Sequence, residues 1–173
     1  MFKDILLFEE EHRRKANEIT AHLLLNMRKL VVGVCGISGT GKSEIAWWIN
    51  RLLYKNNTSG HIVNLDRFYK IPVEKREEFR RETRVIGPAE MDWKSINAEI
   101  FRFRNNDFDV LIFEGLYAGY VDTNYLYYIE KSDAFKFRKL RGKEDEENAF
   151  RRFVVKMESH AVEKTRDCAD LVL

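Results

Sequence analysis

The feature that most constrains this chain is a glycine-rich segment at residues 36–43, with the sequence GISGTGKS. It fits the pattern G-x-x-x-x-G-K-[ST], in which backbone N–H groups surround the phosphates of a nucleotide. Glycine is needed because a chain that turns closely around an anion adopts conformations that a Cβ would block. Residues 30–35 before the segment are apolar and rich in β-branched side chains, and residues 44–54 after it predict a helix. This order of strand, loop and helix is the context in which the pattern forms a P-loop.

The P-loop pattern also predicts which groups contact the nucleotide. Lys42 would reach the β- and γ-phosphates and take part in catalysis, and the Ser43 hydroxyl would bind Mg²⁺. The predicted cofactors are therefore ATP or GTP, together with Mg²⁺. The residues expected to contact the nucleotide are Gly36, Ser38, Gly39, Thr40, Gly41, Lys42, Ser43 and Glu44.

Composition and charge exclude several classes of protein. The 173 residues suffice for one domain with a proper core, and the hydrophobic (45%) and charged (34%) shares are those of a soluble globular protein. The formal net charge of +2 creates no field that would require a nucleic-acid or membrane partner. The apolar residues 5–8 are followed at once by three glutamates, unlike a signal peptide, and no segment approaches a membrane span in length. We expect a cytoplasmic protein.

The cysteines and histidines give no sign of a metal site. Cys35 and Cys168 fall on or beside predicted strands, so we expect both to be buried core thiols rather than a disulfide or metal ligands. The histidines at positions 12, 22, 61 and 160 show no ligand spacing with one another or with the cysteines. The sequence therefore predicts no zinc site.

Hydrophobic periodicity divides the chain into a helical N-terminal segment and an α/β domain. Apolar residues recur every three to four positions over residues 3–28, which predicts an amphipathic helix. This segment, 1–29, is expected to pack on the domain, and a dimer contact through it stays open, so the protein is a monomer or a homodimer. The strands expected in the domain, 30–173, are 30–35, 61–65, 109–113, 125–129 and 169–173, and the helices 44–54, 73–84, 92–104 and 144–166.

Alternating strands and helices predict a three-layer α/β fold of the P-loop NTPase type, with a five-stranded parallel sheet and an extra N-terminal helix. In such a sheet the ligand site lies beyond the carboxyl ends of the strands. The P-loop, Asp66 and Glu114 each follow a predicted strand, so we expect them to meet. Glu114 is a candidate for holding Mg²⁺ with Ser43, through a metal-bound water, or else a helix-capping or solvent-facing acid. Asp66 is a candidate base for an attacking hydroxyl, or else only a turn former.

Residues 65–70, LDRFYK, closely resemble the Asp-x-Phe-Tyr-Lys segment of the uridine kinase-like family of P-loop kinases. The GISGTGKS loop and the strand that ends in Glu114-Gly115 are similar to that family as well. Asp133 with Arg138 and Arg141 looks like its lid helix, and residues 169–172 look like its last strand. The resemblance implies that Asp66 orients the acceptor hydroxyl, that Tyr69 lines the acceptor site, and that Arg138 and Arg141 close over the phosphates in a lid around residues 138–147.

One segment departs from the family. Its Phe-Asp-His-Pro sequence, which helps to bind the nucleoside, is replaced by VIGPAEMD at residues 85–92. The resemblance therefore predicts a small-molecule kinase whose acceptor is a nucleoside or related riboside, with uridine as one version. Charges of both signs alternate over residues 73–84, which favours a solvent-exposed, self-paired helix over one that recognises an anionic acceptor together with Arg67.

Two other functions stay open from the sequence. A nucleotide-binding regulatory protein that has lost catalysis is compatible with the altered acceptor segment. A GTPase-like switch is less favoured, because the chain lacks the guanine-reading Asn-Lys-x-Asp sequence, and no Asp-x-x-Gly follows the strand that carries Glu114.

Overall fold

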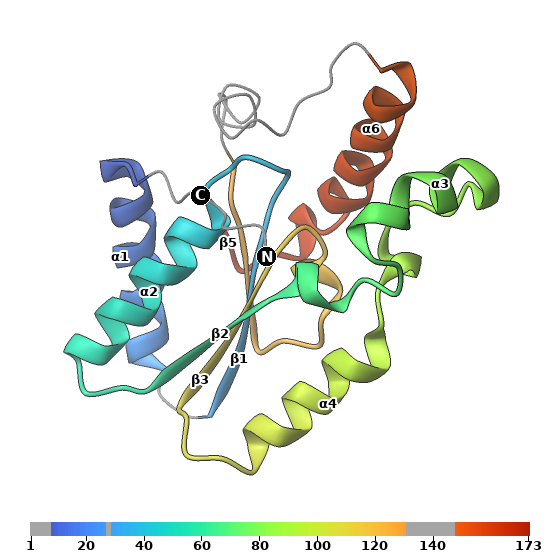
Figure 1. Ribbon diagram of the computed structural model, residues 1–173. Coiled ribbons are helices and arrows are strands. Elements are labelled where there is room, and N and C mark those ends of the chain that lie inside the picture. The colour runs from blue at the N-terminus through green and yellow to red at the C-terminus, as the bar shows by residue number, and fades with distance from the viewer. Residues whose placement is uncertain (1–7, 27–28, 131–147) are drawn as a thin grey trace.

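The computed structural model describes residues 8–26, 29–130 and 148–173. These residues form a five-stranded sheet in the order β2-β3-β1-β4-β5, and every neighbouring pair of strands is parallel (Figure 1). The predicted parallel α/β sheet is therefore confirmed. The strands are β1 (Leu30–Cys35), β2 (Gly60–Asn64), β3 (Val110–Glu114), β4 (Tyr125–Tyr128) and β5 (Leu171–Val172).

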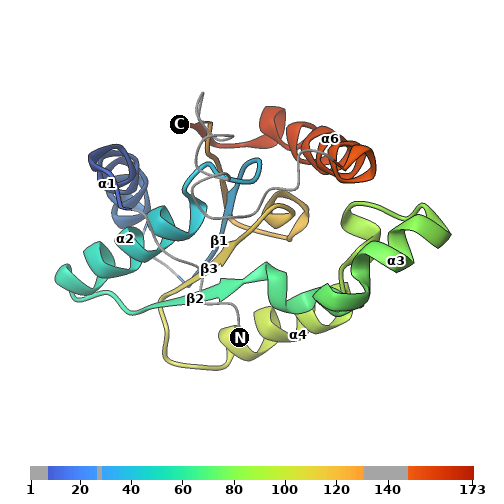
Figure 2. The same ribbon diagram turned by 45° about the horizontal axis from the view of Figure 1, so that its top comes forward.

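Helices cover both faces of this sheet and complete the three layers. One face is covered by α1 and α2, and the other by α4 and α6 (Figure 1). Helix α3 lies beyond the sheet, beside α6, in both ribbon views (Figure 2). The helices are α1 (Glu10–Leu25), α2 (Lys42–Lys55), α3 (Val73–Thr83), α4 (Trp93–Arg104) and α6 (Ala149–Glu163).

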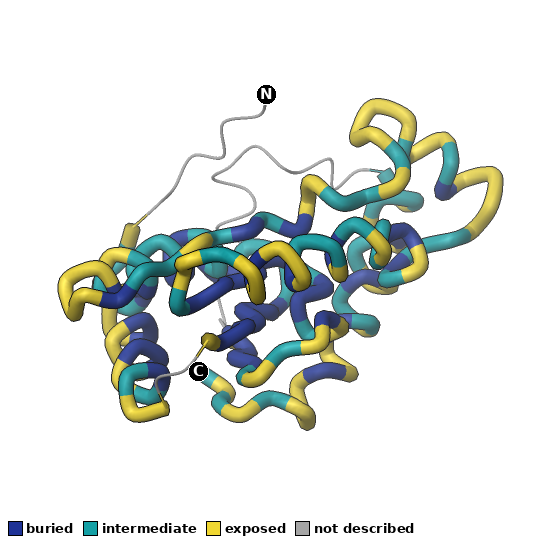
Figure 3. Tube along the Cα trace, turned by 90° about the horizontal axis from the view of Figure 1, so that it is seen from below, coloured by how far each residue is buried: buried dark blue, intermediate teal, exposed yellow. Residues whose placement is uncertain are grey.

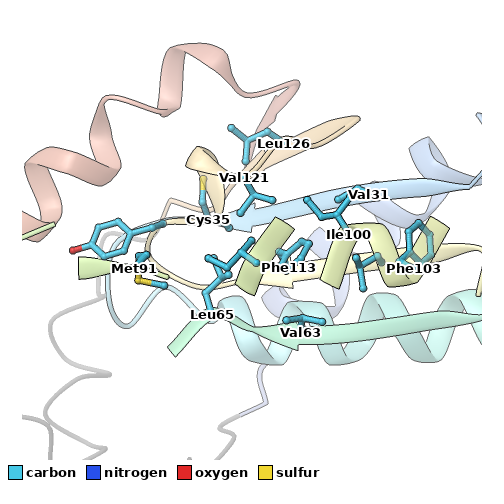
Figure 4. Close-up of a cluster of buried hydrophobic side chains, with 14 of the residues drawn as sticks. Val31, Cys35, Val63, Leu65, Met91, Ile100, Phe103, Phe113, Val121 and Leu126 are labelled. Carbon is cyan, nitrogen blue, oxygen red and sulfur yellow. The ribbon is translucent and has the colours of Figure 1, made fainter. Parts of the chain in front are cut away.

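The side chains of β1 alternate between two hydrophobic cores, as the period of two along a strand requires. Val31 and Cys35 lie in the core under α4 and α6, with Ile100 and Phe103 of α4 (Figure 4). Leu30, Val32 and Val34 lie in the other core, with α1 and α2. Burying each such aliphatic side chain contributes about 1.5–3 kcal/mol. In Figure 3 the buried positions accordingly follow the strands and the inner sides of the helices.

The N-terminal helix begins later than predicted. Instead of starting at residue 3, α1 starts at Glu10, with Phe8 and Glu9 outside it. The reason is a cap at Glu9, whose backbone N–H donates to His12 Nδ1 at 3.2 Å. Ala16 and Ile19 of α1 are fully buried against α2. Among the described helices, none is long and apolar enough to span a membrane.

The C-terminal part of the chain also differs from the prediction. Helix α6 starts at Ala149 because the Asn148 side chain caps it, accepting hydrogen bonds from the N–H groups of Phe150 and Arg151. The predicted strand 169–173 is reduced to Leu171–Val172, since residues 166–168 form a 3₁₀ turn. This turn carries Cys168 to the surface, so the prediction that Cys168 is a core thiol is wrong, whereas Cys35 is buried.

Candidate active site

The P-loop joins β1 to α2 at the upper end of the sheet in Figure 1. Gly36 and Gly41 have φ values of +146° and +85°, in the region that favours glycine. A Cβ on Gly36 would collide with the carbonyl oxygen of Ile129, and one on Gly41 would collide with the ring of His12, which is 2% exposed. The loop therefore fits closely between the end of β4 and α1.

Lys42 is the first residue of α2, and its ammonium turns back onto the loop. Its Nζ donates to the carbonyl oxygen of Ile37 at 2.8 Å, and the buried Thr40 hydroxyl donates to the same oxygen at 3.1 Å. The N-terminus of an α-helix carries a partial positive charge and free N–H groups. The loop thus presents a cation and a helix N-terminus at one place, which suits a phosphate.

Glu114 lies directly beside this loop. The sheet register pairs Glu114 with Val34 of β1 on one side and with Asn64 of β2 on the other. The Ser43 hydroxyl donates to Glu114 Oε2 at 3.1 Å, and Asn64 Nδ2 donates to Oε1 at 2.5 Å. Glu114 is only 4% exposed, so the alternative of a solvent-facing acid is wrong.

The electrostatics of Glu114 suit a cation. Burial is the main reason that the pKa of its carboxyl rises to about 7; the negative charge of Asp66 also raises it, and the positive charge of Lys42 lowers it. A buried carboxylate is costly unless a positive charge compensates it. Carboxylate and hydroxyl oxygens are the ligands that Mg²⁺ prefers. Ser43 and Glu114 therefore fit a magnesium ion.

A pH dependence of stability follows from Glu114. The pKa of Glu114 in the folded protein is about 7, above the ordinary value of 4.5, so folding favours the protonated carboxyl. The resulting contribution to stability is complete below pH 4.5. That contribution is lost as the pH rises through the higher value. In metal-free protein this loss should lower the free energy of unfolding by roughly 2 kcal/mol between about pH 5 and pH 8.

Urea unfolding at several pH values measures this effect, and Glu114→Gln should remove it. The matched control is Glu163→Gln, which changes an exposed acid at the end of α6 and should keep the wild-type pH dependence. An unchanged pH dependence in Glu114→Gln would show that another group is responsible.

Asp66 follows β2 in a short 3₁₀ helix, η1 (Leu65–Phe68). Asn64 caps this helix, because its Oδ1 accepts a hydrogen bond from the Asp66 N–H at 2.7 Å. The same Asn64 side chain donates to Glu114, so one amide connects the backbone of Asp66 to the buried carboxylate. The side chains of Asp66 and Arg67 are exposed beyond the end of the sheet.

Tyr69 belongs to a segment that a second loop supports. Tyr69 forms an isolated antiparallel bridge with Met91, and Asp92 N–H donates to the Phe68 carbonyl at 2.7 Å. The guanidinium of Arg76 lies 3.6 Å from the centre of the Tyr69 ring, a cation–π contact. Burial, together with the charges of Glu158 and Asp66, raises the pKa of Tyr69, so its phenol stays neutral.

A buried ion triad lies behind Tyr69. Arg80 of α3 forms two hydrogen bonds to Glu90, at 2.6 and 2.8 Å, and one to Glu158 of α6 at 2.8 Å. These three residues are 3%, 2% and 6% exposed. The prediction of a solvent-exposed, self-paired helix over 73–84 holds for Arg81 and Glu77, whose pair is exposed, and is wrong for Arg80.

The solved structures that are similar to this chain include two that are described as kinases. A "putative fructose transport system kinase" from Silicibacter sp. TM1040 matches with a TM-score of 0.66 and 17% identity, covering 94% of this chain and 98% of the other. A "possible uridine kinase" from Bacillus stearothermophilus matches with a TM-score of 0.58 and 16% identity, covering 94% and 99%. The chain has a P-loop kinase fold. No protein-family model matches the sequence, and no curated protein does.

Within this P-loop kinase fold, the structure brings most of the predicted site residues together at the carboxyl ends of β1, β2 and β3. Arg138 and Arg141, with the lid predicted around 138–147, lie outside the described residues. Glu44 is fully buried in the first turn of α2.

Sequence reasoning missed several residues of this site. Asn64 was not singled out, although an Asn two residues before a strand-end Asp is a common capping arrangement. The triad of Arg80, Glu90 and Glu158 has no local signal, because its members are 10 and 78 positions apart.

Proposed function

We propose that this protein is a kinase that transfers the γ-phosphate of ATP or GTP to a hydroxyl of a small acceptor, such as a nucleoside or related riboside. The observation that carries the proposal is the continuous set of hydrogen bonds from Ser43 through Glu114 and Asn64 to Asp66. It joins the predicted phosphate-binding loop to the backbone N–H of Asp66, the residue that carries an exposed carboxylate.

The donor half of the site is the P-loop with its neighbouring acid. The amides of Gly39, Gly41 and Lys42 would hold the phosphates, and the Lys42 ammonium would leave the Ile37 carbonyl to neutralise the β- and γ-phosphates. Ser43 and Glu114 would hold Mg²⁺, which neutralises the charge that develops on the transferring group. Because Glu114 already accepts two hydrogen bonds, we favour contact with the metal through water.

The acceptor half is the segment after β2. Asp66 would accept the proton of the acceptor hydroxyl as that oxygen attacks the γ-phosphate, with the hydroxyl held in line. Tyr69 would line the acceptor site and Arg67 would lie at its edge. Arg138 and Arg141 are proposed to close over the phosphates and exclude water. We further propose that the protein acts in the cytoplasm as a monomer or homodimer, without nucleic acid.

Release of ADP tests this proposal. In the presence of ATP and Mg²⁺, purified protein should release ADP rapidly only when a suitable acceptor is present. Tight binding of ATP without product across a broad panel of nucleosides and sugars would favour a regulatory protein that has lost catalysis. Hydrolysis of GTP that needs no acceptor and responds to a protein partner would favour a GTPase-like switch.

A further inference from the structure

Tyr117 lies between the two halves of the site. It follows Glu114 by three residues, after Gly115, whose φ of +150° and close approach to Leu65 require glycine. The Tyr117 side chain is 1% exposed. Its ring centre lies 6.3 Å from those of Tyr69 and Tyr120, in edge-to-face arrangements. Tyr117 thus contacts the proposed acceptor segment from the turn that follows β3, the strand that ends in the proposed metal-binding acid.

The hydroxyl of Tyr117 is buried without a hydrogen-bond partner among the residues that the structure describes. Two other tyrosine hydroxyls do have partners. Tyr127 Oη lies 2.8 Å from His22 Nδ1, and Tyr120 Oη donates to the Ala161 carbonyl at 2.7 Å. Leaving a buried hydroxyl unpaired reduces stability, so such a group calls for an explanation.

Tyr117 and Tyr69 lie near the same charged residues. Burial raises the pKa of Tyr117, and Glu158, Glu90 and Arg80 act on it, although it also belongs to the core cluster under α4. Glu158 and Arg80 act on Tyr69 as well. The two phenols therefore lie near the same charges, and their rings are in edge-to-face contact. Because the Tyr117 phenol stays neutral, it can both donate and accept a hydrogen bond.

We propose that Tyr117 is a specificity-determining residue whose hydroxyl forms a hydrogen bond with the acceptor. This inference rests on the proposed kinase function. It predicts that the acceptor carries a second polar group, a hydroxyl or a carbonyl, next to the hydroxyl that is phosphorylated. Since the Tyr117 hydroxyl is buried, the acceptor reaches it by displacing a neighbouring side chain, and half-buried Tyr69 is the neighbour on the acceptor segment. A site that holds a buried polar group for its substrate rejects analogues that lack the matching group.

Tyr117→Phe tests this assignment by removing one oxygen atom. Acceptor kinetics are measured with every compound that the wild type phosphorylates among uridine, cytidine, D-ribose and D-fructose. We expect the KM for the acceptor to rise about three- to tenfold, because a change of this size corresponds to the loss of one neutral hydrogen bond. The KM for ATP should be unchanged. The melting temperature of the variant should be unchanged or higher, because no protein–protein hydrogen bond is lost.

Tyr127→Phe is the matched control, since the same oxygen is removed from an equally buried tyrosine that has a partner. It should lower the melting temperature by about 2–4 °C and leave the KM for the acceptor unchanged.

Two results would overturn the assignment. One is a loss of melting temperature in Tyr117→Phe as large as that in Tyr127→Phe, which would show that the hydroxyl has a structural hydrogen bond. The other is an unchanged KM for every acceptor that the wild type uses. If the wild type phosphorylates no acceptor, the proposed function fails independently of Tyr117. The comparison of melting temperatures needs no acceptor, so it still tests whether the Tyr117 hydroxyl is unpaired.

Discussion

Asp66→Asn is expected to slow phosphoryl transfer by about 10²–10⁴-fold while the affinity for ATP stays at the wild-type value. An amide of the same shape cannot accept the proton of the acceptor hydroxyl, so the attacking oxygen is not activated. The backbone at position 66 should not move, because the bond from its N–H to Asn64 Oδ1 does not involve the side chain. The affinity should persist because, in the proposed site, the P-loop residues would hold the phosphates without Asp66.

Turnover and ATP affinity must be measured on the same preparation, the first by product formation and the second by calorimetry. The matched control is Asp107→Asn, an exposed aspartate before the amino end of β3, far along the strand from Glu114. It should behave as the wild type. Undiminished turnover in Asp66→Asn would rule out Asp66 as the base.

Arg80→Ala is expected to lower the free energy of unfolding by about 3–5 kcal/mol. The substitution leaves Glu90 and Glu158, at 2% and 6% exposure, without the cation that compensates both. Because these acids come from the loop that supports Tyr69 and from α6, their repulsion should separate that loop from α6. Chemical denaturation measures the loss.

The control for this prediction is Arg102→Ala. Arg102 pairs with Glu99 at 2.6 Å on the surface of α4, with its side chain 67% exposed. Exposed pairs of this kind contribute about 0–1 kcal/mol. If Arg80→Ala and Arg102→Ala destabilised the protein equally, the buried triad would have no special role in stability.

The sequence predicted the parallel sheet and the strand–loop–helix order around residues 36–43, because these depend on local periodicity and on glycine. It also placed Glu114 and Asp66 at the same edge of the sheet, since the carboxyl ends of parallel strands lie together. The boundaries of α1 and α6 were less accurate. They depend on caps, at Glu9 and Asn148, that local hydrophobicity does not reveal.

Burial of charged residues was the least predictable property. Arg80 lies in a helix whose other charges alternate as on an exposed surface, and only the approach of α6 shows that it is buried. Cys168 shows the opposite error, because a local 3₁₀ turn over residues 166–168 leaves it exposed beside the expected strand. For Arg80 the outcome depends on a contact between segments far apart in the sequence.

The most direct test of the proposed kinase activity is to follow the γ-phosphate itself. The protein is incubated with ATP labelled at the γ-phosphate, Mg²⁺, and a pool of nucleosides, sugars and vitamin alcohols, and the labelled products are identified by mass. We predict one labelled phosphate ester of a small hydroxyl compound, which is absent with Lys42→Ala and forms about 10²–10⁴-fold more slowly with Asp66→Asn. Label that stays in ATP, or that appears only as inorganic phosphate whatever acceptor is present, would contradict the kinase function.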